Sequence, residues 1–292
     1  MDGNLSNALI LSGTGITGIA WELGVLFGFE EGGVDVINAN LIASTSAGSI
    51  VGAQICSGKK MEYLYHQQLK FIKETMKNEV IIKGQEFRKM MAAVIMSSPD
   101  SKTARIRIGE AALAASTMSE GEYLELIAEY LPSQEWDRKR NLIINTVNAE
   151  NGEWVTFDSN SNIPLLIAVA ASSAVPGMFP PITINGKRYI DGGIAGTNAD
   201  LGKGYDGVLI LVAEPSIIHP PMGPTMHRKS FQEELKELEQ SGCKVMIITP
   251  DEESLRIKGT NPWDVTLASA SAEAGYRQGI SLSEEVKSFW DF

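Results

Sequence analysis

One short segment constrains the fold of this chain more than any other: an apolar run that turns at a serine set among very small residues. Leu41–Thr45 has the composition of a buried strand, and a helix-like segment begins directly after Ser46. A sharp strand-to-helix turn of this kind, a nucleophile elbow, holds a serine hydroxyl clear of the backbone. It also places that hydroxyl at a helix N-terminus, where partial positive charge favours a developing anion.

The residues around Ser46 fit such a turn but depart from the common pattern Gly-x-Ser-x-Gly. Ser44 replaces the first glycine, whereas Ala47 and Gly48 are as small as the tight backbone approach requires. Strand–Ser-Ala-Gly–helix turns also occur where no reaction takes place. On this motif alone, a reactive serine and a small-residue packing turn are both open.

A glycine-rich turn precedes this one. Residues 13–18 follow a strand expected at 7–11, precede a helix expected at 19–31, and fit the pattern G-x-G-x-x-G. A dinucleotide site would need a carboxylate at the end of the next strand, but Asp35 comes before that strand, which disfavours a nucleotide. Glycines at a helix N-terminus also let backbone amides point outward, as an oxyanion hole requires. A purely structural tight turn is the remaining interpretation.

Two strand–helix units so close together predict a parallel sheet covered by helices on both faces. Further strands are expected at 141–147, 153–157, 208–212 and 244–248, and Asn185-Gly186 is typical of a two-residue hairpin turn. With no internal repeat or clear linker, residues 1–292 are predicted to form one domain with a mostly helical insertion at about 60–135. Within that insertion, residues 90–96 are interpreted either as a core helix or as a methionine-rich lid or lipid-contact helix.

Composition and charge exclude several classes of function. The net charge of −11 argues against nucleic acid as a partner. The chain has no apolar stretch of membrane-spanning length and no evident signal peptide, so we expect a soluble cytoplasmic protein with room for peripheral membrane contact. Cys56 and Cys243 are expected to be buried core residues, and no Cys/His cluster has metal-ligand spacing.

A nucleophilic serine needs a base, and the chain offers 3 histidines. His66 lies in a charged helical segment, and His227 sits beside two basic residues that would weaken an imidazole as a base. His219 precedes two prolines. Ser46, Asp191 and His219 have the chain order of an α/β-hydrolase triad, but that fold usually builds several strands before its serine.

Asp191 is the stronger candidate for the base. It ends a strand and is followed by Gly192 and Gly193, which would let the chain fold back and let amides orient the carboxylate. An aspartate in water has a pKa of ~3.9 and is a weak base, but burial near the serine would raise its proton affinity. The alternative is an ordinary turn aspartate, because Asp-Gly is a common turn pair.

Four segments, taken in order, resemble the patatin-like phospholipase family. They are residues 13–18, residues 44–49, residues 171–181 and the run Asp191-Gly192-Gly193. The likeness covers roughly residues 7–213 and is weak between 60 and 140.

The resemblance implies a Ser–Asp dyad in place of a triad, with Ser46 as nucleophile and Asp191 as general base. It implies a three-layer α/β/α sandwich with a central, mostly parallel sheet, and lipid acyl hydrolysis that uses no metal and no cofactor. The oxyanion hole would be formed by the amides of the glycine loop, namely Gly13, Thr14, Gly15, Ile16 and Gly18. The elbow and the dyad would be supported by Ser44, Ala47, Gly48, Gly192 and Gly193.

Two positions depart from the family pattern. Thr14 stands where the family usually has the middle glycine of a Gly-Gly-Gly run, and Ser44 stands at the first glycine of the elbow. Each adds a Cβ atom at a place where the backbone is often unusual. Many relatives also carry a basic residue in the glycine loop, where this chain has Ile16 and Thr17.

We therefore expect a serine lipid acyl hydrolase, of the phospholipase A or lysophospholipase type, that cleaves carboxylic esters through an acyl-enzyme. Its expected partners are a phospholipid or another fatty-acyl ester and, transiently, a membrane or micelle surface, with no nucleotide. Two alternatives stay open: a catalytically silent lipid-binding or regulatory protein on the same fold, and an acyltransferase.

Overall fold

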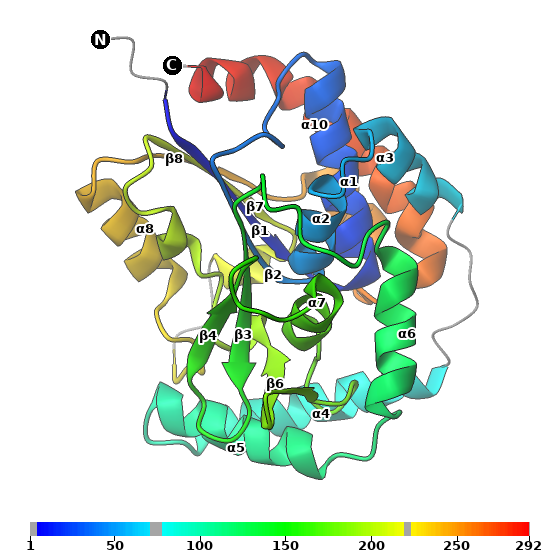
Figure 1. Cartoon of the computed structure of the whole chain (residues 1–292), viewed down its shortest axis with the longest axis vertical. Coiled ribbons are helices and arrows are strands. Elements are labelled where there is room, and N and C mark those ends of the chain that lie inside the picture. The colour runs from blue at the N-terminus through cyan, green and yellow to red at the C-terminus, as the bar shows by residue number, and fades with distance from the viewer. Residues whose placement is uncertain (1–4, 71–77, 219–222, 292) are drawn as a thin grey trace.

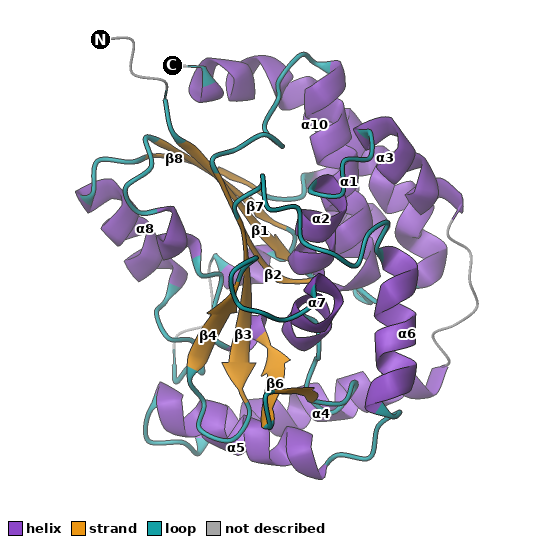
Figure 2. Ribbon diagram, viewed as in Figure 1, coloured by secondary structure: helices purple, strands orange, loops and turns teal. Residues whose placement is uncertain are grey.

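A mixed β-sheet between two layers of helices forms the framework of the protein (Figure 1, Figure 2). The computed structural model describes residues 5–70, 78–218 and 223–291. The strands follow the order β5-β6-β3-β2-β1-β7-β8, with β4 paired to β3 outside this path. Their bounds are β1 Asn7–Gly13, β2 Leu41–Ser46, β3 Leu142–Asn148, β4 Trp154–Phe157, β5 Ile182–Ile184, β6 Lys187–Asp191, β7 Gly207–Val212 and β8 Lys244–Ile248.

The centre of the sheet is parallel, and one side is antiparallel. Strands β3, β2, β1, β7 and β8 run in the same direction, whereas β4 and β6 run antiparallel to β3, and β5 antiparallel to β6. The predicted α/β fold with a mostly parallel central sheet is thus confirmed. Because β6 runs backwards, its last residue, Asp191, pairs with Thr146 near the carboxyl ends of the parallel strands.

Alternating side chains of β1 bury into two different cores. Leu9 and Leu11 face the layer that contains α1, α2, α7 and α10, while Ala8 and Ile10 face Phe231 of α8 on the other side. The α-helices are α1 Gly15–Glu31, α2 Ala47–Ile55, α3 Met61–Lys70, α4 Asn78–Met96, α5 Ser101–Ala114, α6 Glu120–Tyr130, α7 Leu165–Ser172, α8 Phe231–Gln240, α9 Glu252–Lys258 and α10 Ala268–Trp290. Short 3-10 turns are η1 Gly192–Ile194, η2 Ala199–Gly202, η3 Pro215–Ile217 and η4 Val265–Leu267.

Helices α1 and α10 pack with almost no space between their backbones. A Cβ atom added to Gly24 would lie 2.1 Å from the carbonyl oxygen of Ala272, and one added to Gly279 would lie 2.4 Å from that of Val25. The sequence predicts separate helices at 263–279 and 281–290. That prediction is wrong, because Gly279 is a contact point inside one continuous helix and not a helix stop.

The segment between α2 and β3 contains helices α3 to α6. Residues 71–77, part of a helix expected at 61–77, lie outside the described residues. Helix α4 does not behave as a core helix along its whole length, since Met90 is 37% exposed and Met96 is 68% exposed. Its Phe87 side chain is buried against the end of the sheet, together with Ile108 of α5 and Ile190 of β6.

The remaining sequence expectations concern the cysteines and the membrane. Cys56 and Cys243 are both buried and unbridged. None of the helices in the described part of the chain is both long and apolar enough to cross a bilayer. A feature that the sequence did not indicate is Glu22 in α1, whose complete burial raises the pKa of its carboxyl well above the usual value and favours the neutral form.

Candidate active site

Ser46 lies at the end of β2, opposite Gly13 at the end of β1, where the chain turns sharply into α2. Its backbone has φ 55° and ψ −131°, a conformation that residues with a side chain rarely adopt. Such strain costs about 1–3 kcal/mol and persists only where the surrounding structure enforces it. This strained backbone is what a nucleophile elbow requires, because the sharp turn holds the Ser46 hydroxyl away from the main chain.

Small residues permit the elbow because α2 rests directly on the end of β1. A Cβ atom on Gly48 would lie 2.4 Å from the carbonyl oxygen of Leu11, and one on Gly13 would lie 2.7 Å from the amide nitrogen of Gly48. Ser44, in contrast, lies in regular strand β2, where its hydroxyl donates to the carbonyl oxygen of Ile143 at 3.2 Å. Its substitution for the usual glycine therefore introduces no backbone conflict.

Ser46 and Asp191 are in direct contact. The Ser46 hydroxyl donates a hydrogen bond of 2.7 Å to Oδ2 of Asp191, and the amide of Gly193 donates one of 2.7 Å to Oδ1. Gly192 allows this turn to approach the sheet closely, since a Cβ atom there would lie 2.2 Å from the carbonyl oxygen of Asn145. The carboxylate is thus oriented from both sides.

Burial raises the pKa of Asp191 to about 6, while the hydrogen bonds from Ser46 and from the Gly193 amide act in the opposite direction. The side chain is almost completely removed from solvent, with 5% of its surface exposed. The cost of burying the charge therefore outweighs the stabilisation by its two donors. At neutral pH this carboxylate is ionised but binds a proton much more readily than an aspartate in water.

The glycine turn is shorter than the loop over 13–18 that the sequence predicts. Strand β1 continues to Gly13 and α1 begins at Gly15, so Thr14 alone links them. Thr14 has φ −135°, which suits a residue with a side chain, whereas Gly15 has φ 61° and a Cβ atom there would lie 2.5 Å from the carbonyl oxygen of Pro262. The threonine in place of a family glycine is therefore compatible with the turn.

The first amides of α1 differ in availability. The amide of Thr17 donates to the carbonyl oxygen of Pro262 at 3.1 Å, and that of Gly18 donates to Thr14 within the helix at 3.1 Å. The amide of Gly18, which the sequence predicts as an oxyanion donor, is therefore engaged inside the helix in this structure. The amides of Thr14, Gly15 and Ile16 precede the first intrahelical bond and have no acceptor within the helix itself.

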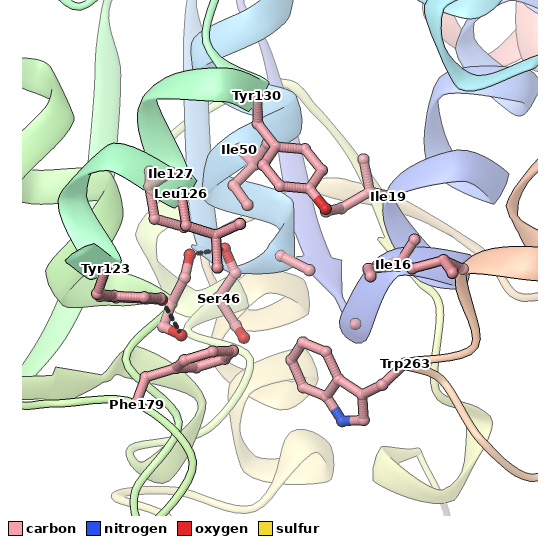
Figure 3. Close-up of a pocket in the computed structure, with 14 residues that line it drawn as sticks. Ile16, Ile19, Ser46, Ile50, Tyr123, Leu126, Ile127, Tyr130, Phe179 and Trp263 are labelled. Carbon is pink, nitrogen blue, oxygen red and sulfur yellow. Dashed lines mark hydrogen bonds between the residues drawn. The ribbon is translucent and has the colours of Figure 1, made fainter. Parts of the chain in front are cut away.

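Two cavities meet at Ser46. The first is lined almost entirely by apolar side chains of α1, α2 and α6 together with Phe179 and Trp263, and Figure 3 shows these side chains converging on Ser46. The second contains Thr14, Asp191 and His227 beside apolar residues of α4. Gly15, Ser46 and Trp263 line both cavities. The Ser46–Asp191 pair therefore lies where an apolar cavity meets a more polar one.

Comparison with known proteins assigns the chain to a family. The family model described as "Patatin-like phospholipase" matches residues 9–200, which include both Ser46 and Asp191. The chain belongs to the patatin-like phospholipase family. No curated protein sequence matches it.

Two solved structures are similar to this chain. VipD from Legionella pneumophila shares 16% identity at a TM-score of 0.47, with 96% of this chain and 67% of that protein covered. ExoU from the type III secretion system of Pseudomonas aeruginosa, solved in complex with SpcU, shares 17% identity at a TM-score of 0.40, with 97% and 52% covered. The chain thus spans about two thirds of VipD and about half of ExoU.

The candidates outside the pair lie in different places in this patatin-like fold. His227 lines the second cavity, and burial and the nearby Arg105 lower its pKa. His66 is exposed on α3, and His219 lies outside the described residues. Asp35 lies near the amino end of β2, at the edge of the sheet opposite the glycine turn, and lines neither cavity. Within the described ranges, no cluster of three or more His, Cys, Asp or Glu side chains is arranged to hold a metal ion.

Residues 171–181 have a supporting role that becomes visible only in the structure. Ser172 accepts a hydrogen bond of 3.0 Å from the amide of Ser46, and Ser173 donates one of 3.1 Å to its carbonyl oxygen. The next residue, Ala174, accepts a hydrogen bond of 3.1 Å from the amide of Asp191. Residues 172–174 therefore fix the backbones of both members of the pair, and only the two consecutive serines could have signalled this role.

A second support that the sequence did not reveal is Glu234 of α8. This buried carboxylate accepts hydrogen bonds from the amides of Asn198 and Ala199, at 3.1 Å and 3.0 Å, and from the Thr197 hydroxyl. It thereby clamps the chain that follows Asp191-Gly192-Gly193. The same burial raises the pKa of Glu234 to about 7.

Proposed function

We propose that this protein is a serine acyl hydrolase, of the phospholipase A or lysophospholipase type, in which Ser46 is the nucleophile and Asp191 the general base. The observation that carries the proposal is the 2.7 Å hydrogen bond from the Ser46 hydroxyl to a buried carboxylate at the junction of two cavities. Membership of the patatin-like phospholipase family and the strained backbone of Ser46 support the same assignment.

In the acylation step, the Ser46 oxygen attacks the ester carbonyl carbon while its proton passes to Asp191 Oδ2. The amides of Thr14 and Gly15, with that of Ile16 beside them, stabilise the negative oxygen of the tetrahedral intermediate at the N-terminus of α1. When this intermediate collapses, the C–O bond to the leaving alcohol breaks and Asp191 returns its proton to the alkoxide. The products are an alcohol and an acylated Ser46.

In the deacylation step, water takes the place of the alcohol. Asp191 accepts a proton from the water as its oxygen attacks the acyl carbon, and the same amides stabilise the second oxyanion. Collapse releases the carboxylic acid, and the proton returns from Asp191 to the Ser46 oxygen. A base whose pKa is about 6 suits both directions of transfer near neutral pH, because it is ionised yet accepts a proton readily.

The lining of the first cavity favours a fatty-acyl ester as substrate, and such esters are presented at membrane or micelle surfaces. The supporting observation is that Ile16, Ile50 and Leu126 all line a cavity that opens on Ser46. We also propose that residues 1–292 act as one catalytic unit with a helical segment at about 60–135, because Pro262 and Trp263 complete the site beyond residue 200. The mechanism assigned to these residues uses no metal ion or cofactor.

Ester hydrolysis by matched variants tests the proposal. The substrate is p-nitrophenyl butyrate, and the variants are Ser46→Ala and Asp191→Asn, with Ser281→Ala and Asp35→Asn as controls of the same chemistry far from the site. Loss of the nucleophile or its base should lower kcat by at least about a thousandfold, as for residues that act as a catalytic unit. The two controls should stay within about twofold of the wild type.

Equal rates for the wild type, Ser46→Ala and Asp191→Asn would overturn the mechanism, and a common rate no higher than that of the uncatalysed reaction would favour a silent lipid-binding protein. Product analysis with glycerol as an added acceptor separates hydrolysis from acyl transfer. Free acid as the main product supports the hydrolase.

A further inference from the structure

The two cavities at Ser46 differ in their access to Asp191, and this difference determines the orientation of a bound substrate. Both contain Ser46, Gly15 and Trp263, but Asp191 lines only the second. We propose that the first cavity is the acyl-chain site, that Tyr130, Ile50 and Ile19 end it after a medium-length chain, and that the second cavity holds the leaving alcohol and the hydrolytic water. This inference rests on the proposed function and adds the orientation and length of the substrate.

The path of the proton fixes the orientation. Asp191 must protonate the leaving oxygen and later deprotonate the attacking water, so both oxygens have to approach from the side that the carboxylate faces. That side is the second cavity, where polar groups of Thr14 and His227 also lie. The acyl chain is bonded to the same carbonyl carbon but points away from the leaving group, and the first cavity is the space available there.

The walls of the first cavity have the chemistry of a hydrocarbon site. Helix α1 contributes Ile16 and Ile19, and α6 contributes Leu126 and Ile127. Each methylene that moves from water into such surroundings gains about 0.8 kcal/mol. A polar or charged acyl group would lose its hydration there without finding partners.

The length of the cavity follows from the helices that flank it. Ile50 lies four residues beyond Ser46 along α2, which is about 6 Å, and Tyr130 lies seven residues beyond Tyr123 along α6, which is about 10 Å. In the view of Figure 3, Tyr130, Ile50 and Ile19 stand together on the side of the cavity away from Phe179 and Trp263. An extended chain advances about 1.2 Å per bond, so this depth fits about five to eight carbons.

The first cavity is too small to admit an acyl chain unless some of its lining side chains move. Its volume is about 40 Å³, well below the ~150 Å³ of a known apolar cavity that admits benzene. Tyr123 is held in place, since its hydroxyl donates to the carbonyl oxygen of Ser173 at 2.7 Å and its ring stacks on Phe179. Leu126 and Trp263 are only partly buried and can change rotamer. Leu126 is therefore the side chain whose size should control entry of the chain.

The test is the dependence of kcat/KM on acyl length. Monomeric p-nitrophenyl esters from acetyl to dodecanoyl are measured below their critical micelle concentrations, with the wild-type chain of residues 1–292 and with Leu126→Trp, Leu126→Ala and Tyr130→Ala. Leu124→Trp and Leu124→Ala are matched controls, because Leu124 lies on the same helix, is similarly half-buried and does not line the cavity. A variant of the second cavity, Met91→Trp, probes the leaving-group side.

For the wild type, kcat/KM should rise about fourfold per added methylene, equivalent to ~0.8 kcal/mol, and stop rising at about five to eight carbons. Leu126→Trp should move this break to shorter chains and lower the ratio of the octanoyl to the acetyl value about tenfold. Leu126→Ala and Tyr130→Ala should move it to longer chains. The Leu124 variants should keep the wild-type break, and Met91→Trp should change the preference among leaving alcohols at a fixed acyl length.

Two kinds of failure are distinguishable. If no ester is hydrolysed in a Ser46-dependent manner, the proposed function fails. If turnover depends on Ser46 but the break is absent, is unmoved by Leu126 and Tyr130 variants, or moves with Met91→Trp, the assignment of the acyl chain to the first cavity is overturned while the proposed function stands.

Discussion

Asp191 shows how one residue becomes a base through its surroundings. An aspartate in water would be a poor proton acceptor from serine, but removal from solvent raises the pKa of Asp191 to about 6. The hydrogen bonds from Ser46 and Gly193 keep the carboxylate oriented and limit the rise. The same burial that makes the carboxylate expensive to ionise therefore makes it useful.

The pH dependence of ester hydrolysis tests this view of Asp191. The base must be ionised in the free enzyme, so kcat/KM for a neutral ester should be constant above pH 7 and fall about tenfold per pH unit below the pKa of about 6. His227 lines the same cavity, so His227→Gln should keep the acidic limb in place. A limb near pH 4, or one that disappears in His227→Gln, would contradict the assignment to Asp191.

At the residue level, the sequence was most informative where small residues are required. The glycines after Asp191 and the small residues after Ser46 are visible because tight turns leave few choices of side chain. The supporting contacts of Ser172 and Glu234 were not visible, since a buried hydrogen bond between distant segments leaves no local pattern. The position of Trp263 at the junction of the two cavities could not be predicted either, because it results from tertiary packing.

At the level of elements, local turn chemistry was a reliable guide and long helices were not. The predicted Asn-Gly hairpin joins β5 to β6, with φ 50° at Asn185 and φ 76° at Gly186, as a type I′ turn requires. The sequence predicts no helix at the position of α9, and it predicts a break near Gly279 in what the structure shows to be one C-terminal helix. A glycine inside a helical pattern usually indicates that the helix ends there. Gly279 is instead retained inside α10 because it allows close contact with α1, and this contact arises only in the folded protein.

The close packing of α1 on α10 predicts opposite effects for two glycine-to-alanine changes. A Cβ atom at Gly275 would lie 2.4 Å from the carbonyl oxygen of Trp21, whereas one at Gly121 in α6 would meet nothing within 4 Å. Gly275→Ala should lower the free energy of unfolding by about 1–3 kcal/mol despite its better helix propensity. Gly121→Ala should raise it by up to about 1 kcal/mol.

Urea unfolding followed by circular dichroism measures both changes. If Gly275→Ala were as stable as Gly121→Ala, the two helix backbones could not be as close as the structure places them.

At the scale of the whole molecule, the sheet brings together residues from three regions of the chain. Ser46 comes from β2, Asp191 from β6 and Trp263 from the segment before α10, and only the first two lie within the residues matched by the family model. The sheet's antiparallel side returns Asp191 to the carboxyl ends of the parallel strands. The sequence indicated an α/β fold from two strand–helix units, but strand order and the two cavities depend on long-range packing that no local pattern records.

The central claim is that Ser46 is the nucleophile, and covalent labelling tests it most directly. The protein of residues 1–292 is treated with an alkyl fluorophosphonate at pH 8, and the modified peptide is identified by mass spectrometry, with Ser46→Ala and Ser281→Ala treated in parallel. We predict one label per molecule on Ser46, strong slowing in Asp191→Asn, and no labelling of Ser46→Ala. Labelling of another serine, or no labelling of the folded wild-type protein, would contradict the account.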